Sequence, residues 1–306
     1  MIEINYDANT VMRGNYPIIK KLGACSPRGE MTPFVWEGRL YRSELAGDDY
    51  AGADTIIRDV ETGKVIASLA KDSYFTSAFV DDDEVYVLGV DKEKRDTINI
   101  FKSRDLVNWK KEILLTNPGW TYYNTSLTKN EEGYVLALES DHADFAGSEP
   151  FTIFFAKSSD LKEWEHLDPT RFTNSKERYS GGPWFKYSEG WYYLITVTML
   201  PCKRFTNYIF RSKDLETWYV GYYNPILMPD ADDRKISPNH AADLEDKMDE
   251  ILHGGFNINN SDIDMCDWQG KTYINYFTGN QLGTSWWMME AEYDGTVAEF
   301  LKSYFE

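Results

Sequence analysis

The sequence has few cysteines, no long apolar run and no targeting segment. Its three cysteines, Cys25, Cys202 and Cys266, are too few for a disulfide framework, and no CxxC pair suggests a zinc site. No stretch approaches the roughly 18 apolar residues of a membrane-spanning helix. The first residues, MIEINYDANTV, lack the basic and apolar regions of a signal peptide. We therefore expect a cytoplasmic protein that does not enter a membrane.

Several catalytic motifs and an excess of positive charge are also missing. The sequence contains no GxSxG, P-loop, dinucleotide fingerprint or HExxH. Serine hydrolases, nucleotide hydrolases, Rossmann enzymes and zincins therefore have no support. Fifty acidic residues against 32 Lys and Arg give a formal net charge of -18. Because a surface this negative repels phosphate backbones and anionic lipid, we expect neither nucleic acid nor a membrane surface as a partner.

The sequence is rich in aromatic residues, and three tryptophans end a repeated motif. Aromatics make up 15% of the chain, including 10 Trp and 21 Tyr. The motif SxDLxxW starts at Ser103, Ser158 and Ser212, at intervals of about 55 residues, which is typical of a repeat architecture. Its Ser and Asp suit a turn in which short side chains bond to nearby backbone, and its Trp can pack back across the strands.

A second repeat consists of an apolar stretch, a polar turn and a Tyr-rich stretch, which is the pattern of a β-hairpin. It occurs five times, beginning at Pro33, Phe79, Ser126, Trp184 and Met265. Five such units predict an all-β fold, a five-bladed β-propeller, with residues 1–306 as a single domain. A β-sandwich is the alternative, but it predicts no such regular period.

One short helix and the closure of the ring can also be predicted. Apolar residues recur at helical spacing between residues 237 and 255, and Gly254-Gly255 can end a helix there. We expect this segment to be a helical excursion before the fifth blade. Both chain ends carry apolar residues, so we predict that both pack at the seam beside the fifth unit. These residues are Ile2, Ile4 and Tyr6 at the start, and Val297, Phe300, Leu301, Tyr304 and Phe305 at the end.

The repeated turn and the five hairpins resemble the five-bladed propeller glycoside hydrolases of families 32, 43, 62, 68 and 117 over nearly the whole chain. The resemblance implies hydrolysis of an oligosaccharide, by an exo-acting enzyme with paired carboxylates at the central funnel. In family 43 the acids come from an Asp-Pro, an Asp on a later blade and a Glu-Gly-Pro. Here the corresponding segments read Thr32-Pro33, Asn124-Thr125-Ser126 and Gly181-Gly182-Pro183.

The chain therefore resembles a bacterial subfamily that lacks the family-43 triad, and three functions stay open. The first is a glycosidase that uses other carboxylates. The second is a carbohydrate-binding propeller without activity. The third is a glycoside phosphorylase, which would need a basic pocket for phosphate.

Four carboxylates are candidates for acid and base catalysis, because glycoside hydrolysis needs one protonated and one ionised carboxyl group. Asp262 and Asp264 alternate with Asn260 on one face of a strand-like stretch, where packing alone would not place charges. Glu30 precedes Met31-Thr32-Pro33, and Glu139 closes the stretch GYVLALES. The alternatives are a polar turn for the residues around Asp262, a solvated loop for Glu30 and a blade rim for Glu139.

A further set of side chains is expected to contact the sugar. Flat aromatic faces stack on sugar rings, and a guanidinium can clamp an acidic substituent. Core packing is the alternative for each aromatic, pairing with local acids for each arginine, and an exposed loop position for the histidine. The predicted binding residues are Arg28, Trp120, Tyr122, Asn124, Arg178, Trp184, Asn260, His253 and Trp286.

We expect no required cofactor. The oxygen-rich group of Asn260, Asp262 and Asp264 would suit calcium better than zinc, either as a structural ion or in the active site. The sequence does not distinguish such a metal site from a carboxylate pair, and it gives no indication of the oligomeric state.

Overall fold

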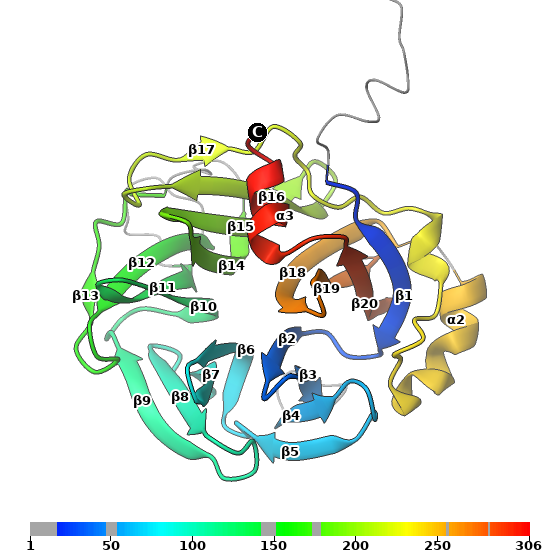
Figure 1. The fold of residues 1–306 in the computed structure, drawn as a ribbon, viewed down its shortest axis with the longest axis horizontal. Coiled ribbons are helices and arrows are strands. Elements are labelled where there is room, and N and C mark those ends of the chain that lie inside the picture. The colour runs from blue at the N-terminus through cyan, green and yellow to red at the C-terminus, as the bar shows by residue number, and fades with distance from the viewer. Residues whose placement is uncertain (1–16, 47–53, 142–150, 173–178, 255–256, 281) are drawn as a thin grey trace, which may run out of the picture.

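The structure, a computed structural model, describes residues 17–46, 54–141, 151–172, 179–254, 257–280 and 282–306. Within them, five four-stranded antiparallel sheets form a ring around a central axis, with the first strand of each hairpin innermost (Figure 1). The predicted five-bladed β-propeller is thus confirmed. All five predicted hairpins are the inner two strands of a blade.

The blades follow one another in chain order, except that the last is completed by the first strand of the chain. Blade I contains β2 (Met31–Trp36), β3 (Arg39–Ala46), β4 (Asp54–Asp59) and β5 (Val65–Leu69). Blade II contains β6 (Ser73–Asp81), β7 (Glu84–Asp91), β8 (Thr97–Ser103) and β9 (Lys110–Thr116). Blade III contains β10 (Tyr122–Asn130), β11 (Gly133–Ser140), β12 (Thr152–Ser158) and β13 (Glu165–His166). Blade IV contains β14 (Ser180–Ser188), β15 (Trp191–Leu200), β16 (Arg204–Ser212) and β17 (Tyr219–Val220). Blade V contains β18 (Asn259–Trp268), β19 (Lys271–Gly279), β20 (Trp286–Tyr293) and β1 (Lys20–Ser26).

The SxDLxxW motif forms the turn between the third and fourth strands of blades II, III and IV. In the first copy the Asp105 carboxylate accepts hydrogen bonds from the backbone N–H groups of Val107 and Asn108, at 2.9 and 2.7 Å. The motif leucine has a left-handed backbone in all three copies and is buried. The turn therefore places one apolar side chain between neighbouring blades, while the Trp packs beside it.

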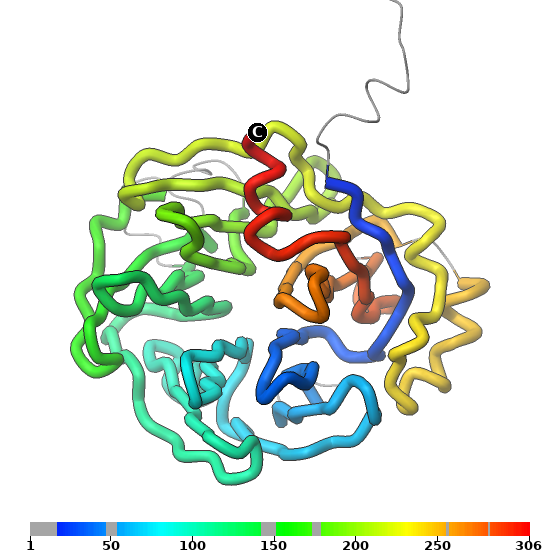
Figure 2. Tube along the Cα trace, in the orientation of Figure 1, coloured from blue at the N-terminus to red at the C-terminus, as the bar shows by residue number. Residues whose placement is uncertain are grey.

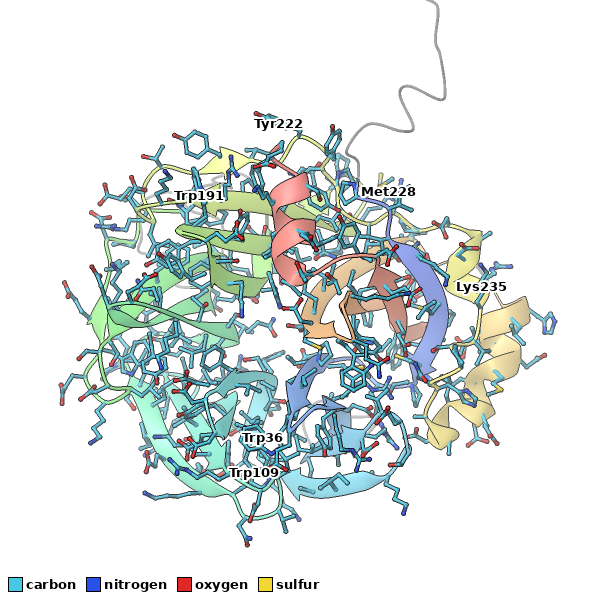
Figure 3. All side chains as sticks on the ribbon, viewed as in Figure 1. Trp36, Trp109, Trp191, Tyr222, Met228 and Lys235 are labelled. Carbon is cyan, nitrogen blue, oxygen red and sulfur yellow. The ribbon has the colours of Figure 1, made fainter. Side chains whose placement is uncertain are left out.

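The hydrophobic core is divided among the interfaces between blades, because each sheet is apolar on both faces. On β7, Val85 and Val87 pack toward blade I, whereas Tyr86 and Leu88 pack toward blade III. Trp36 and Trp109 lie in the same cluster, at the junction of blades I and II (Figure 3). Apolar residues on both faces are what a radial arrangement of sheets requires, since each blade is covered on two sides.

The ring closes where β1, the first described strand, pairs with β20, the last, so these two strands lie side by side (Figure 2). The edge of β1 that faces away from β20 bonds to the segment that contains Lys235 and Ser237. Ala24 donates its N–H to the carbonyl of Lys235 (2.7 Å), and the carbonyl of Ala24 accepts a hydrogen bond from the N–H of Ser237 (2.9 Å). Gly23 makes this approach possible, because a Cβ there would lie 2.6 Å from the backbone of Ile236.

The predicted excursion before the fifth blade is present as short helical segments. They are η1 (Ala231–Arg234), η2 (Ala242–Lys247) and α2 (Met248–His253), and the last two lie within the predicted range. None of the helices in the described part of the chain is long and apolar enough to span a membrane.

The C-terminal segment forms a helix, α3 (Val297–Ser303), that packs in the core between blades IV and V. Phe300, Leu301 and Tyr304 are fully buried there. Ile2, Ile4 and Tyr6, which we expected at the seam as well, lie outside the described residues.

Candidate active site

A pocket lies at the axis, where the inner strands begin, and backbone bulges give it its lining. Four of the five inner strands have a β-bulge near their first residues. The bulge in β10 contributes one residue to the pocket lining, and each of the other three bulges contributes two. Three of these residues have a left-handed backbone, with φ of +50°, +51° and +48° for Phe75, Gly182 and Asp262. The bulge residues that line the pocket are Phe75, Thr76, Asn124, Gly182, Pro183, Asp262 and Ile263.

The structure brings the four predicted catalytic carboxylates together at this pocket. Glu30, Asp262 and Asp264 line it directly. Glu139, on β11, reaches it through contacts with two lining residues, Asn124 and Gly182. The acids come from blades I, III and V, so the ring closure places groups from distant parts of the sequence in one electrostatic environment.

Glu139 is held by three hydrogen-bond donors. Its Oε2 accepts from Asn124 Nδ2 and from the N–H of Gly182, both at 2.8 Å, and its Oε1 accepts from the Tyr179 hydroxyl at 2.9 Å. Burial raises the pKa of Glu139, while the three donors act in the opposite direction. The donors fix the carboxylate in position and favour its ionised form.

Glu30 has the opposite environment. Its Oε2 is buried and has no hydrogen-bond partner among the described residues. Burial raises the pKa of Glu30 well above its usual range, and the carboxylates of Asp262, Glu139 and Asp264 raise it further. Glu30 is therefore the acid of this group that is most suited to hold a proton near neutral pH.

Asp262 lies in the bulge of β18, and Asp264 directly follows it. Asp262 accepts a hydrogen bond from the Ser261 hydroxyl at 2.6 Å, and burial raises its pKa. Burial and the Asp262 carboxylate together raise the pKa of Asp264 well above the usual range, against a hydrogen bond from Thr32. Neighbouring carboxylates of this kind do not ionise at the same pH, so acid and base forms can coexist in the pocket.

Three segments of this chain lack the carboxylate that family 43 has in the corresponding place. In each of them, a carboxylate from another strand lies against the residue that is present. Thr32 bonds to Asp264, and Asn124 bonds to Glu139. A Cβ at Gly181 would lie 2.4 Å from Glu139 Oε1, and one at Gly182 would lie 2.8 Å from Asp262 Oδ1. The missing side chains at Gly181 and Gly182 leave the space that the carboxylates of Glu139 and Asp262 occupy.

The bulge in β18 corrects the expected position of Asn260. Asn260 pairs with Thr278 and Asp264 with Asn275, so the extra residue between them places the two on opposite faces of the sheet. Asn260 is fully buried and does not line the pocket. Strict alternation, on which the prediction depended, fails at this point.

Most of the aromatic side chains predicted to bind sugar pack in the core instead. Tyr122 is fully buried between blades II and III, and Trp120 packs there edge-on to Phe154, with ring centroids 4.9 Å apart. Trp184 is 7% exposed in the core between blades IV and V. Trp286 lies at the start of β20, outside the pocket, with the Lys247 ammonium 4.6 Å from its ring centroid.

The predicted basic residues do not line the pocket either. Arg28 forms an ion pair with Asp243 of η2, as the alternative interpretation held. His253 is exposed on α2 and pairs with Asp249. Arg178 lies outside the described residues. Of the nine predicted binding residues, only Asn124 is among the described residues that line the pocket.

An arc of partly exposed aromatic rings near the pocket was missed. The arc runs from blade II to blade IV, and the centroids of successive rings in it lie 4.7 to 5.8 Å apart. Phe75 lines the pocket, and Tyr179 bonds to Glu139. Their places at the starts of inner strands were the signal that could have revealed them. The arc consists of Tyr74, Phe75, Tyr123, Phe151, Tyr179 and Phe205.

The geometry does not form the expected calcium ligand set. Asn260 is buried away from the pocket that Asp262 and Asp264 line. In the described part of the chain, no three His, Cys, Asp or Glu side chains are grouped so that they could hold a metal ion.

Comparison with known proteins supports the fold. No family model matches the sequence, and no curated protein matches it. A solved structure described as a glycoside hydrolase has a TM-score of 0.67 at 11% identity, covering 95% of this chain and 96% of the other. The catalytic domain of the Coprinopsis cinerea GH62 α-L-arabinofuranosidase has a TM-score of 0.65 at 8% identity, covering 92% and 98%. A thermostable family-43 glycoside hydrolase has a TM-score of 0.59 at 14% identity, covering 90% and 91%. The chain therefore has the fold of the five-bladed propeller glycoside hydrolases.

Proposed function

We propose that the protein is a glycoside hydrolase that removes a terminal sugar from an oligosaccharide. The observation that carries this proposal is the group of four carboxylates, from three blades, at one axial pocket. Their hydrogen bonds differ: Glu139 accepts three, whereas Glu30 Oε2 accepts none from the described residues. This difference supports the pairing of a protonated with an ionised carboxyl group that glycoside hydrolysis requires. The narrow axial pocket supports exo action, because it suits a chain end better than a chain interior.

The environments suggest a role for three of the four acids. Glu30, which is the most suited to stay protonated, would donate its proton to the leaving oxygen. Glu139, fixed by its three donors, would remain ionised and stabilise the positive charge that develops on the sugar. Asp264 would act as the base, because it accepts a hydrogen bond from Thr32 that favours its ionised form, whereas Glu30 Oε2 lacks such a bond among the described residues. A basic carboxylate is a good acceptor of a proton from water.

The other two functions have less support. A non-catalytic binding propeller was suggested by the missing triad, but neighbouring strands supply carboxylates at each of those positions. A phosphorylase needs a cation for phosphate, and no Lys or Arg is among the described residues that line the pocket. Hydrolysis is therefore the function that the site favours.

The test is a screen of aryl glycosides and oligosaccharides with the wild type, Glu30→Gln, Asp264→Asn and the control Glu37→Gln. Glu37 lies in the exposed turn of blade I, so its substitution changes the same charge outside the pocket. We expect turnover by the wild type and the control, and a loss of about 10²-fold or more in the other two. Saturable binding without turnover would favour the binding propeller, and turnover dependent on added phosphate would favour the phosphorylase. Equal rates in all four proteins would contradict the assignment.

A further inference from the structure

A second hollow lies on the propeller axis directly behind the pocket. Along every inner strand, the residues that line the front pocket come before those that line this rear hollow. On β6, Thr76 lines the front and Ala78 the rear, and on β10, Asn124 lines the front and Leu127 the rear. The same order in all five strands shows that the two spaces are stacked along the axis. The exposed side chain of Lys186 lies on the rear hollow.

Two residues border both spaces. Ser77 of blade II and Asp264 of blade V line the front pocket and also the rear hollow. Thr32, which bonds to Asp264, lines the rear hollow only. Among the described residues, Asp264 is the only one of the four acids that borders both spaces, and we call its position the neck between them.

The two spaces differ in size and suit different contents. The rear hollow has about 150 Å³ open to water, which is room for roughly ten molecules at 10–15 Å³ each. Polar groups along it, including Thr32, Ser126, Lys186 and Asp267, can hold such waters. The front pocket has about 30 Å³, room for about two waters. This space cannot hold a whole sugar ring, so the reacting end of a terminal sugar fills it and leaves little space for water to pass beside it.

We propose that the water consumed in hydrolysis reaches the sugar from the rear hollow, through the neck at Asp264. This proposal deepens the proposed function and depends on it. A sugar that enters from the front directs its leaving group toward the mouth, so an attacking water must come from the opposite side. That side is the neck, where Asp264 can bind the water and orient it toward the anomeric carbon.

The step balances as a single displacement. The water oxygen forms a bond to the anomeric carbon, and one of its protons passes to the Asp264 carboxylate. The glycosidic bond breaks, and the leaving oxygen takes a proton from the carboxyl group of Glu30. Asp264 then returns its proton to water in the rear hollow, and Glu30 regains one from solvent once the product has left.

The experiment blocks the rear hollow without touching the acids. Ala78→Leu adds three carbons to a residue that lines it, whereas the control Ala67→Leu makes the same change in the same hydrophobic cluster, away from either space. With an aryl glycoside that the wild type hydrolyses, we expect Ala78→Leu to lower kcat about tenfold with KM within twofold, and Ala67→Leu to match the wild type.

The waters in the rear hollow and the activities of the two proteins test the proposal further. A crystal structure of the wild type should show ordered waters extending from Lys186 to Asp264, and a dry hollow would overturn the proposal. Full activity of a folded Ala78→Leu variant would overturn the water route alone. A wild type that hydrolyses no glycoside would instead overturn the proposed function.

Discussion

Replacing Gly181 by alanine should misplace Glu139, because the carboxylate occupies the space beside this glycine. A Cβ there would lie 2.4 Å from Glu139 Oε1 and 2.5 Å from its Cδ. An ordinary carbon–oxygen contact is about 3.3 Å, so the carboxylate would have to move by roughly 0.9 Å. The side chain can move more easily than the strand, but it then loses good geometry to its donors. A displacement near 1 Å in a catalytic constellation costs about 10²-fold in rate.

The assay is steady-state kinetics on the substrate identified by screening, with thermal unfolding in parallel. We expect kcat/KM of Gly181→Ala to fall about 10²-fold while the melting temperature falls by a few degrees at most. Gly190→Ala is the matched control in the same blade, because a Cβ at Gly190 meets nothing within 4 Å, although its φ of +79° costs some stability. If Gly181→Ala retained activity within threefold of the wild type, Glu139 would not be a functional carboxylate of the pocket.

Three further predictions concern the same site and the closure of the ring. Glu30→Gln should unfold at a higher temperature than the wild type at pH 8, with a smaller difference at pH 4. The raised pKa of Glu30 stabilises the wild-type fold fully only below the unfolded pKa of about 4.3. This stability is lost as pH rises through the folded pKa, whereas the glutamine variant loses none of it. Melting curves of both proteins across this range check it, and a difference independent of pH would contradict it. Tyr179→Phe removes one of three donors to Glu139, so kcat/KM should fall about tenfold and the acidic limb of the pH–rate profile should move to higher pH. An unshifted limb would exclude a positioning role for Tyr179. Phe300→Ala should lower the free energy of unfolding by about 3–5 kcal/mol, because the Phe300 side chain is fully buried beside blade V. Calorimetry should then show a melting temperature lowered by roughly 5–10 °C. A shift below 2 °C would mean that α3 does not secure the seam.

The architecture could be predicted because it is repeated in the sequence. Hairpin patterns and the SxDLxxW turn recur in successive blades, and each copy depends on local chemistry: a polar turn, alternating apolar residues and a buried leucine. The partner of β1 could not be predicted in the same way. This strand pairs with β20 on one edge and bonds to Lys235 and Ser237 on the other, and both partners lie more than 200 positions away.

The candidate site was predicted in part. Asp262, Asp264, Glu30 and Glu139 could be selected because acids at the ends of otherwise apolar strands are costly unless a functional site needs them. The error at Asn260 came from the bulge in β18, which reverses the alternation within one strand. Trp120 and Tyr122 were misassigned because an aromatic that stacks on sugar and one that fills a core have the same sequence signature. Only the radial packing of the blades distinguishes the two.

The central claim is that the four carboxylates surround the bond that is cleaved. The most direct measurement is a crystal structure of the Glu30→Gln variant soaked with an oligosaccharide that the wild type hydrolyses. The account predicts that the terminal sugar lies in the axial pocket, with its anomeric carbon between residue 30 and Asp264 and with Glu139 beside the ring. Sugar bound only elsewhere, such as in the groove lined by Asn130 and Trp164, would contradict it.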